Sequence, residues 1–492
     1  MWHWLGTCLR FNPNDFKLYS TYLSKSGLSN DSGIDWPIGY EDLEPWYESA
    51  EAAIGVAADV QDQQYTAGAP FRNGYQFPMP RINPSYLDQT LGSALDGWNI
   101  DDPDFQPPVP LNVRSTPQGR NSIGYDGRPP CMGNTNCVPI CPIAAKYDAT
   151  VHVKKALAAG VELQPESVAF NVLLDDPNNS NPKVTGIEYK RWDGTTGTAV
   201  GKVYFIATHA VETPKILLMS TSQLSGGVAN KSGQVGKFLM DHNTQLSWAL
   251  LPEGAPVYPF RGPLSTSGIE DLRDGPFRST RGAFRIEIGN DGWNWPTAAP
   301  YSTVKYFVGG KGMYGKNLLN AVADDCSRQI RFASLVEPIP SPNNSVSVTT
   351  QYRDALGLPR PLINYRLEQY ESDGLQAARN AALAIFKKLG ATDSLNLLGV
   401  DIDPSMQGFV ENCAKPEGFF GAGHTMGTHR MGDDPSKSVV DSYQRSHDHP
   451  NLFLIGCGSF PSVGTSNPTL TMTALVLRTA DYVLSNWNDI SA

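Results

Sequence analysis

The order of apolar and polar positions along the chain predicts a mixed α/β protein. Residues 203–207 form an apolar run that is typical of a buried strand, and a helix is expected after Thr213-Pro214, because proline suits the first turn of a helix. Such a strand–turn–helix segment is one α/β crossover, the unit that covers a parallel sheet. NLFLIG, at 451–456, predicts another strand, and residues 467–487 predict a long terminal helix with Pro468 in its first turn.

The first 130 residues are rich in proline and glycine and predict long loops with a short helix or two. The clearest helix lies within DWPIGYEDLEPWYESAEAAIGV, starting near residue 40 and ending before Gly55. A second helix is expected at 152–159. Two strands are expected at 161–176 and 183–193, on either side of the turn NNSNPK.

From about residue 245 to 415 the pattern changes to alternating strands and one amphipathic helix. SVSVTT (345–350) and PLINYRL (361–367) predict strands. LQAARNAALAIFKKLG (375–390) predicts a helix that ends with Lys387 and Lys388 before Gly390. This block is typical of an antiparallel sheet with helices packed on it, and it suits a substrate-binding domain.

Composition narrows the class of protein. The chain has 492 residues, 40% of them hydrophobic, which is enough for a large core and two domains. A formal net charge of −10 gives no basic surface for nucleic acid. No run of about 18 apolar residues occurs, so no segment is expected to span a membrane, and no signal peptide is visible after Met1.

Three of the seven cysteines lie close together in the sequence. Cys131, Cys137 and Cys141 are spaced C-x5-C-x3-C on a loop rich in Gly, Asn and Pro, which argues against a disulfide framework and for a metal or redox site. A zinc site would need a fourth ligand, for which His152 is the nearby histidine. Three thiolates without a fourth ligand point to a 3Fe–4S cluster. Incidental buried thiols are the alternative.

The C-terminal region holds the candidate catalytic residues. His424 lies in a glycine-rich loop, and Asn467 directly precedes Pro468. An imidazole can take a proton from an alcohol, and a neighbouring amide can fix the alcohol oxygen. The helix that starts after Asn467 would direct free backbone N–H groups and its positive end at the negative charge of a reduced flavin.

These segments resemble the glucose–methanol–choline (GMC) oxidoreductase family. The resemblance rests on GAGHTMGTHRMGDD, SNPTLT and ATHAVETPKILL. It implies that His424 is the catalytic base and Asn467 its partner. It also implies flavin contacts from the residues Gly456, Pro468 and Thr469, and an adenine contact from Val168. For His429, in THRMG, a structural role is at least as probable as a catalytic one.

The opening MWHWLGTCLRF raises the question of what precedes it. Family members carry a GGTTWHW-like segment about a hundred residues in, after a βαβ unit whose G-x-G-x-x-G motif binds the FAD pyrophosphate. No such motif follows a strand here, so an N-terminal truncation is expected. HWLGTCLRF resembles the pyranose-oxidase segment in which a histidine binds flavin covalently. His3 is therefore a candidate for a covalent bond, and the alternative is that Trp2, His3 and Trp4 pack against the flavin edge.

A closer resemblance is to the FAD/3Fe–4S catalytic subunits of bacterial membrane-bound glucose, fructose, sorbitol and gluconate dehydrogenases, through RFNPNDFKLYSTY, YDGRPPC and ICPIAAKYDATVHV. It implies oxidation of a CH–OH group of a sugar, polyol or aldonate, with a 3Fe–4S cluster on the three cysteines. It also implies a cytochrome c subunit as electron acceptor, a small subunit that aids export, and a periplasmic location at the inner membrane. A cytoplasmic location stays open, as do an oxygen-using sugar oxidase and an inactive remnant.

The expected fold is a doubly wound FAD-binding domain that lacks its first βαβ unit, together with an α+β substrate domain built on an antiparallel sheet. The FAD-binding domain is expected to comprise residues 1–20, 145–245 and 415–492. Residues 21–144 would form a loop-rich lid with the cluster segment, and residues 246–414 the substrate domain.

Overall fold

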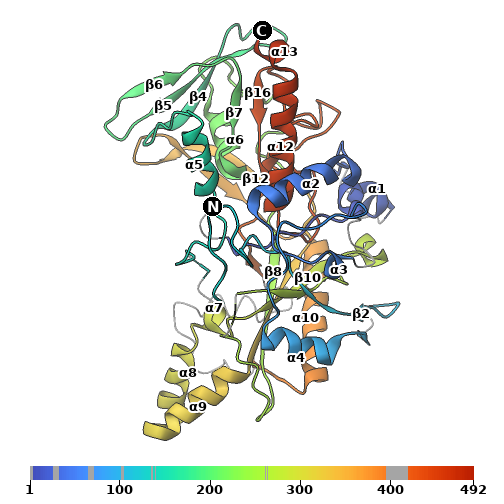
Figure 1. The fold of residues 1–492 in the computed structure, drawn as a ribbon. Coiled ribbons are helices and arrows are strands. Elements are labelled where there is room, and N and C mark those ends of the chain that lie inside the picture. Colours follow the sequence, from blue (N-terminus) through green and yellow to red (C-terminus); the bar gives the residue numbers. More distant parts are fainter. Residues whose placement is uncertain are drawn as a thin grey trace.

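The structure is a computed structural model that describes residues 4–25, 33–64, 71–100, 105–133, 137–138, 140–260, 262, 264–394 and 419–492. These residues form two lobes (Figure 1). One lobe contains α12, α6, β16 and the strands β4, β5 and β6, and the other contains β8, β10, α10, α4, α8 and α9. The chain crosses between the lobes several times, so each lobe is built from segments far apart in the sequence.

Twelve helices are assigned among the described residues. They are α1 (Leu18–Thr21), α2 (Tyr40–Ile54), α3 (Val60–Gln63), α4 (Tyr86–Leu95), α5 (Thr150–Ala158), α6 (His209–Met219), α7 (Asn294–Thr297), α8 (Tyr301–Lys305), α9 (Gly315–Arg328), α10 (Gln369–Leu389), α12 (Thr469–Ser485) and α13 (Trp487–Ser491). The strands in the same part of the chain are β1 (Trp98–Asn99), β2 (Pro110–Leu111), β3 (Val113–Ser115), β4 (Val168–Leu174), β5 (Val184–Lys190), β6 (Thr196–Ala199), β7 (Tyr204–Ile206), β8 (Asn243–Leu250), β9 (Ser267–Ile269), β10 (Phe284–Gly289), β11 (Gln329–Val336), β12 (Ser345–Arg353), β13 (Pro359–Asn364), β14 (Thr392–Asp393), β15 (Phe420–Gly421) and β16 (Leu452–Leu454).

An antiparallel sheet forms the centre of the lobe that contains α10, which is the lower lobe in Figure 1. Its strand order is β14-β8-β11-β10-β9-β3, and β15 pairs with the same edge of β8. Ile286 and Phe332 alternate with polar neighbours along β10 and β11, and they face α10, where Phe332 stacks on Phe386 at 5.5 Å between ring centroids. The opposite face of β10 carries Arg285 and Glu287, which are buried charged residues. The side of β10 and β11 toward α10 is therefore apolar at these positions. The opposite side is charged at β10, whereas at β8 and β11 it carries Leu246, Trp248 and Ala333, which belong to a separate apolar cluster.

The lobe that contains α12, which is the upper lobe in Figure 1, is built around a pair of parallel strands and two packed helices. β7 pairs with β16 in parallel, as the crossover pattern predicts, and α12 packs against α2. The hydroxyl groups of Tyr47 on α2 and Thr471 on α12 lie 2.8 Å apart and join the two helices. β4, β5 and β6 form a separate antiparallel sheet. The combination of a parallel strand pair with helices and antiparallel sheets agrees with the expected fold class, an α/β domain joined to a domain built on an antiparallel sheet.

The start of α6 differs from the expected one. The helix begins at His209, so Pro214 lies inside it rather than in its first turn. Proline has no N–H for the carbonyl four residues earlier, which belongs to Ala210. The Thr428 hydroxyl donates a 2.7 Å hydrogen bond to that carbonyl instead. A residue more than two hundred positions away therefore satisfies the carbonyl that Pro214 leaves free.

The start of α10 also lies earlier than its apolar pattern indicates. The helix starts at Gln369, six residues before Leu375, because Glu371 accepts a 2.7 Å hydrogen bond from the backbone N–H of Glu368 and caps the first turn. Its C-terminus follows the prediction, with Gly390 in the left-handed conformation after Lys387 and Lys388. β12 and β13 are strands as expected, but they pair as a separate hairpin that packs on α6.

Among the described helices, none has the length and apolar character needed to cross a bilayer.

The hydrogen bond from Thr428 to Ala210 can be tested by a double-mutant cycle with Pro214. Thr428→Val removes the hydroxyl from a fully buried position, and we expect it to lower the free energy of unfolding by about 1–2 kcal/mol. In a Pro214→Ala background the new N–H can bond the Ala210 carbonyl, so the same substitution should cost less. Urea unfolding measures both. The control is Thr473→Val, which removes a hydroxyl that bonds the Thr469 carbonyl within regular helix. Equal losses of stability for Thr428→Val in the two backgrounds would contradict the assignment.

Candidate active site

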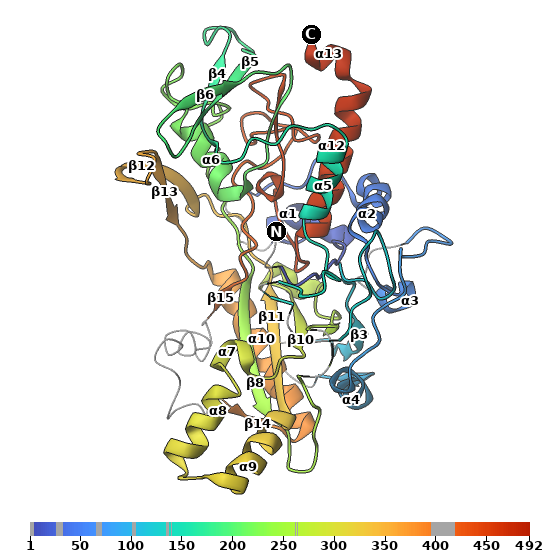
Figure 2. The same cartoon turned by 60° about the vertical axis from the view of Figure 1, so that its left-hand side comes forward.

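The backbone around His424 is held by one carboxylate. His424 lies three residues after the end of β15, a strand that Figure 2 shows beside β8. Asp241 accepts hydrogen bonds from the backbone N–H of His424 at 2.7 Å and of Gly423 at 3.2 Å. Burial raises the pKa of Asp241 to about 6, while these N–H donors oppose the rise. The loop that carries the predicted base is therefore fixed to the residue pair that leads into β8.

The imidazole of His424 contacts a second histidine. His242, which is completely buried, places its Nδ1 2.9 Å from Nδ1 of His424, with the two rings almost perpendicular. The other ring nitrogen of His242, Nε2, lies 2.8 Å from the carbonyl oxygen of Gly464. Gly464 precedes Asn467 by three residues. His242 therefore connects the loop that carries His424 with the loop that carries Asn467.

Arg285 on β10 is the second link between the two predicted catalytic residues. Its Nη1 lies 3.5 Å from Oδ1 of Asn467, and its Nη2 donates to Glu270 at 2.9 Å. Arg285 also lies near enough to His424 to lower the pKa of that imidazole. His424 and Asn467, 43 residues apart in the sequence, thus have Arg285 and His242 as shared neighbours.

Both imidazoles are held in the neutral state. Burial lowers the pKa of His424 well below its usual range, and His242 and the Arg285 cation lower it further. Burial also lowers the pKa of His242 to about 4. A neutral His424 has one ring nitrogen with a free lone pair, so it is ready to accept a proton.

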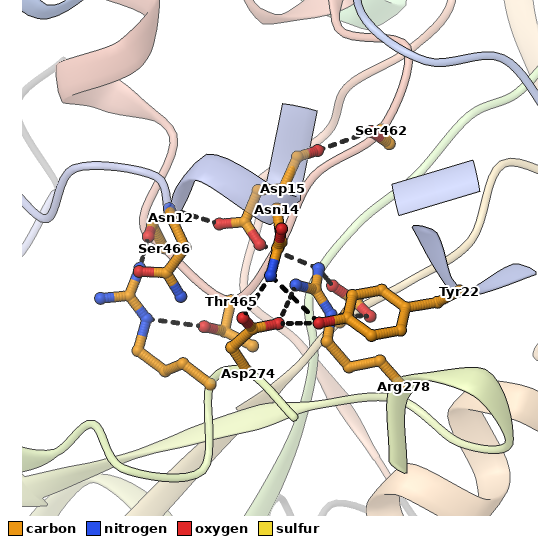
Figure 3. Close-up of polar contacts among 12 residues, drawn as sticks. Asn12, Asn14, Asp15, Tyr22, Asp274, Arg278, Ser462, Thr465 and Ser466 are labelled. Atoms are coloured by element: carbon orange, nitrogen blue, oxygen red, sulfur yellow. Dashed lines mark hydrogen bonds and ion pairs between the residues drawn. The ribbon is translucent and has the colours of Figure 1, made fainter. Parts of the chain in front are cut away.

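The loop before Asn467 is fixed by a second arginine. Arg273 donates a 3.0 Å hydrogen bond from Nε to the Thr465 hydroxyl and another to the Ser466 hydroxyl. Ser466 and Arg273 both also donate to the backbone carbonyl of Arg10. Figure 3 shows Thr465 and Ser466 beside the Asn12 segment. Pro468 is the N-cap of α12, so it lies one residue before the first turn in which the sequence analysis places it.

The same close-up contains a buried ionic cluster around Arg278 (Figure 3). Arg278 pairs with Asp15 at 2.8 Å, with Asp274 at 2.7 Å and with Glu337. Asp15 in turn lies against Gly464, where an added Cβ would meet the carboxyl carbon at 2.3 Å. The cluster thus fixes the position of the glycine whose carbonyl contacts His242.

The residues present fit a flavin nucleotide in this region. The carboxyl ends of the parallel strands β7 and β16 are where open α/β sheets bind nucleotides. Gly456 follows β16 with φ of 112°, and a Cβ added there would meet no atom within 4 Å. After β7, His209 has φ of 74° and places Nε2 2.8 Å from the Thr425 hydroxyl, next to His424. The N-terminus of α12 adds backbone N–H groups that face away from the helix.

The other predicted flavin residues lie in several places. Trp2 and His3 are outside the described residues. Trp4 is half-buried and donates from Nε1 to the Tyr147 carbonyl at 2.7 Å. Val168 begins β4, in a different sheet from β7 and β16. Pro468 and Thr469 form the start of α12.

His429 is a completely buried histidine. Its ring packs directly on Gly458, where a Cβ would come within 2.0 Å of Cε1. Neither ring nitrogen has a hydrogen-bond partner among the described residues, and burial lowers its pKa to about 3. This packing agrees with the structural alternative.

The cysteine loop places its thiols among cations. Arg120 donates from Nη1 to the Cys137 sulfur at 3.3 Å, and Lys146 donates to the Cys137 carbonyl at 2.6 Å. Burial raises the pKa of Cys131, and Cys137 and Cys141 are near enough to raise it further. Within the described ranges, however, no three His, Cys, Asp or Glu side chains are gathered as a ready metal-ligand set. The three thiols are donors of the kind that hold iron–sulfur clusters.

Sequence reasoning missed the residues that hold the site together. No local pattern in the sequence connects Asp241 or His242 to His424. Arg285 lies in GAFRIEIGN, where charged residues alternate with apolar ones. That alternation was the available signal, since it marks a strand with one charged face.

Comparisons with known proteins agree with this architecture. The family model described as GMC oxidoreductase matches residues 340–475. The fructose dehydrogenase large subunit of Gluconobacter japonicus is 33% identical over 487 residues, covering 99% of this chain and 79% of that protein. A 2-methyl-1,2-propanediol dehydrogenase of Mycolicibacterium austroafricanum is 26% identical, covering 99% and 80%. Pyridoxine 4-oxidase from Mesorbium loti has a similar fold, with a TM-score of 0.57 at 16% identity over 97% of this chain and 81% of that chain.

The buried Asp241 carboxyl predicts a pH-dependent stability difference. Its pKa is about 6 in the folded chain and about 4 when unfolded, so the unfolded chain releases the proton first as the pH rises. The free energy of unfolding of the wild type therefore falls between pH 4 and 6 relative to Asp241→Asn. We expect the variant to gain up to about 3 kcal/mol on the wild type between pH 4 and 7.

Chemical denaturation across that pH range measures the difference. The exposed Asp176→Asn serves as the control and should show a much smaller change. A difference between Asp241→Asn and the wild type that stays constant with pH would show that the carboxyl is not held as described.

Proposed function

This chain belongs to the GMC oxidoreductase family, and from that premise we propose that it is an FAD-dependent dehydrogenase that oxidises a CH–OH group of a sugar, polyol or aldonate. The observation that carries the proposal is the position of the His424 imidazole. It contacts His242, which bonds the Gly464 carbonyl in the loop before Asn467, and Asn467 itself contacts Arg285. A proton acceptor and an amide donor held together in this way suit the oxidation of an alcohol.

Each residue of the site has a role in this proposal. His424 accepts the hydroxyl proton of the substrate, and its lowered pKa keeps it unprotonated for this task near neutral pH. The Asn467 amide orients the substrate oxygen. Arg285 supplies positive charge that favours the oxygen anion left as the proton departs. FAD, when bound, supplies the acceptor for the substrate hydride.

The proposed substrate class is supported by a group of charged residues at β10. Arg285 and Glu287 lie on the side of β10 that is turned away from α10, and Arg285 pairs with Glu270, the residue after β9. Such a group suits a substrate with several hydroxyl groups better than an apolar one. The names of the two relatives specify a sugar and a diol, which are in the same chemical class.

We further propose that Cys131, Cys137 and Cys141 hold an iron–sulfur cluster of the 3Fe–4S type. Support comes from the closeness of the three thiols, since Cys137 and Cys141 raise the pKa of Cys131. Arg120 and Lys146 add support, because their positive charges offset the negative charge of thiolates. Lys146 also donates to the backbone carbonyl of Trp4, so the cysteine loop is joined to the predicted flavin edge. When bound, the cluster supplies a one-electron outlet from the protein.

The electron acceptor is proposed to be a separate cytochrome c subunit in the periplasm, with a small partner subunit for export. Support comes from apolar side chains on the cysteine loop, where Met132 is 76% exposed and Ile140 is 54% exposed. Exposed apolar residues beside a redox site suit a docking surface.

The function is tested by flavin reduction in a His424 variant. His424→Ala, purified with its flavin, should reduce the rate of anaerobic flavin bleaching by a saturating sugar or polyol at least about 100-fold, because the hydroxyl proton has no acceptor. Stopped-flow absorbance measures this rate. The matched control, His447→Ala, removes another histidine from the same C-terminal region and should leave the rate within about twofold.

Three other outcomes of this assay have clear meanings. Equal bleaching in His424→Ala and the wild type would remove His424 as the base. Wild-type flavin that no sugar, polyol or aldonate reduces would favour an inactive remnant. Reduced flavin that reacts faster with oxygen than with a dye or cytochrome would favour the oxidase.

The cluster is tested by iron content. Cys131→Ser, Cys137→Ser and Cys141→Ser should each lose most of the protein-bound iron, because each removes one of three ligands. Cys326→Ser, which removes a cysteine on α9, outside the cysteine loop, should keep it. Iron-to-flavin ratios and low-temperature electron paramagnetic resonance give the readout. A wild-type protein that contains flavin but no iron after anaerobic purification would refute the cluster.

A further inference from the structure

His242 has a geometry that determines where the protons of the histidine pair lie. Its Nε2 faces the Gly464 carbonyl at 2.8 Å, and its Nδ1 faces Nδ1 of His424 at 2.9 Å. A carbonyl oxygen can only accept a hydrogen bond, so Nε2 of His242 must carry a proton. These are the two contacts of a completely buried ring, and they leave little freedom in its orientation.

The charge state of His242 then fixes the remaining protons. A doubly protonated ring would need a nearby anion, but the charged groups that face it are Arg285 and Arg273, which lower its pKa. The Asp241 carboxylate is engaged by the backbone N–H groups of residues 423 and 424. His242 is thus neutral, and a neutral imidazole carries one N–H. Its Nδ1 is therefore a lone-pair acceptor.

The proton in the contact between the two rings must then belong to His424. Nδ1 of His424 donates to Nδ1 of His242, and Nε2 of His424 keeps the free lone pair. The opposite tautomer of His424 would set two lone pairs against each other at 2.9 Å.

We propose that His242 is a positioning residue that holds His424 in the Nδ1–H tautomer, so that Nε2 is the atom that accepts the substrate proton. This inference rests on the proposed function of His424. His242 would act as the acidic residue does in hydrolase triads, where it orients the base without reacting itself. Through Gly464 the same ring also sets the distance between His424 and the loop that ends at Asn467.

Two substitutions separate the hydrogen bond from the bulk of the ring. His242→Asn places an amide oxygen at the position of Nδ1 and keeps an acceptor for His424. His242→Phe keeps the ring volume and removes the acceptor. We expect His242→Phe to lower kcat for flavin reduction about 10- to 100-fold with little change in KM, and His242→Asn to recover most of the loss.

A matched control exists in the same chain. His449 is also buried and also bonded through both ring nitrogens, to the Pro182 carbonyl at 2.8 Å and the Ala229 N–H at 3.1 Å. His449→Phe should lower stability as much as His242→Phe does but leave kcat unchanged. Equal losses of kcat in His449→Phe and His242→Phe, or no rescue by His242→Asn, would reduce His242 to a structural residue and overturn the proposal.

The tautomer can be observed directly. The chain contains eight histidines. In holoenzyme labelled with ¹⁵N-histidine, the signals that disappear in His424→Asn are those of His424. We expect Nδ1 of His424 to be protonated in the wild type and in His242→Asn, and Nε2 to be protonated in His242→Phe. A wild-type His424 protonated at Nε2 overturns the inference. This readout needs no turnover, so an Nδ1–H signal in a protein that no alcohol reduces would refute the proposed function while leaving the histidine pair established.

Discussion

The buried cation of Arg278 determines how the two lobes meet. Its guanidinium is fully buried and pairs with Asp15 from the N-terminal segment, Asp274 after β9 and Glu337 after β11. Removing any one segment would leave a charge without its partner in a medium of low dielectric, which costs several kcal/mol. Asp15 lies against Gly464, and the Gly464 carbonyl contacts His242, which contacts His424. The position of the predicted base therefore depends on an ionic cluster that never touches substrate.

Much of the fold could be predicted because its signals are local. The extent of α2 follows from its amphipathic pattern and Gly55, and the start of α12 follows from Pro468. The predictions failed where a distant residue decides the outcome. α6 begins before Pro214 because Thr428 bonds the carbonyl that the proline leaves free. β12 and β13 are recognisable as strands, but their alternation does not say which sheet they join, and they form a hairpin on α6.

The candidate site divides in the same way. His424 and Asn467 could be predicted because both lie in segments whose order matches a family pattern. The residues that fix them could not, since His242 precedes His424 by 182 residues and Gly464 by 222. Arg285 precedes Asn467 by another 182. Such contacts depend on how β8 and β10 present their edges and faces to the loops of the other lobe, and a single sequence does not contain that information.

A neutral histidine beside the base has a different consequence from a carboxylate at the same place. A carboxylate would stabilise the protonated form of His424 and raise its pKa, so a larger fraction of His424 would already be protonated near neutral pH. A neutral partner orients the ring without adding charge, and burial together with Arg285 can then keep the pKa of His424 low. The available carboxylate, Asp241, instead binds backbone N–H groups, which position the loop. The site thus assigns orientation of the ring to a neutral group and orientation of the backbone to a charged one, and this division leaves the His424 imidazole unprotonated near neutral pH.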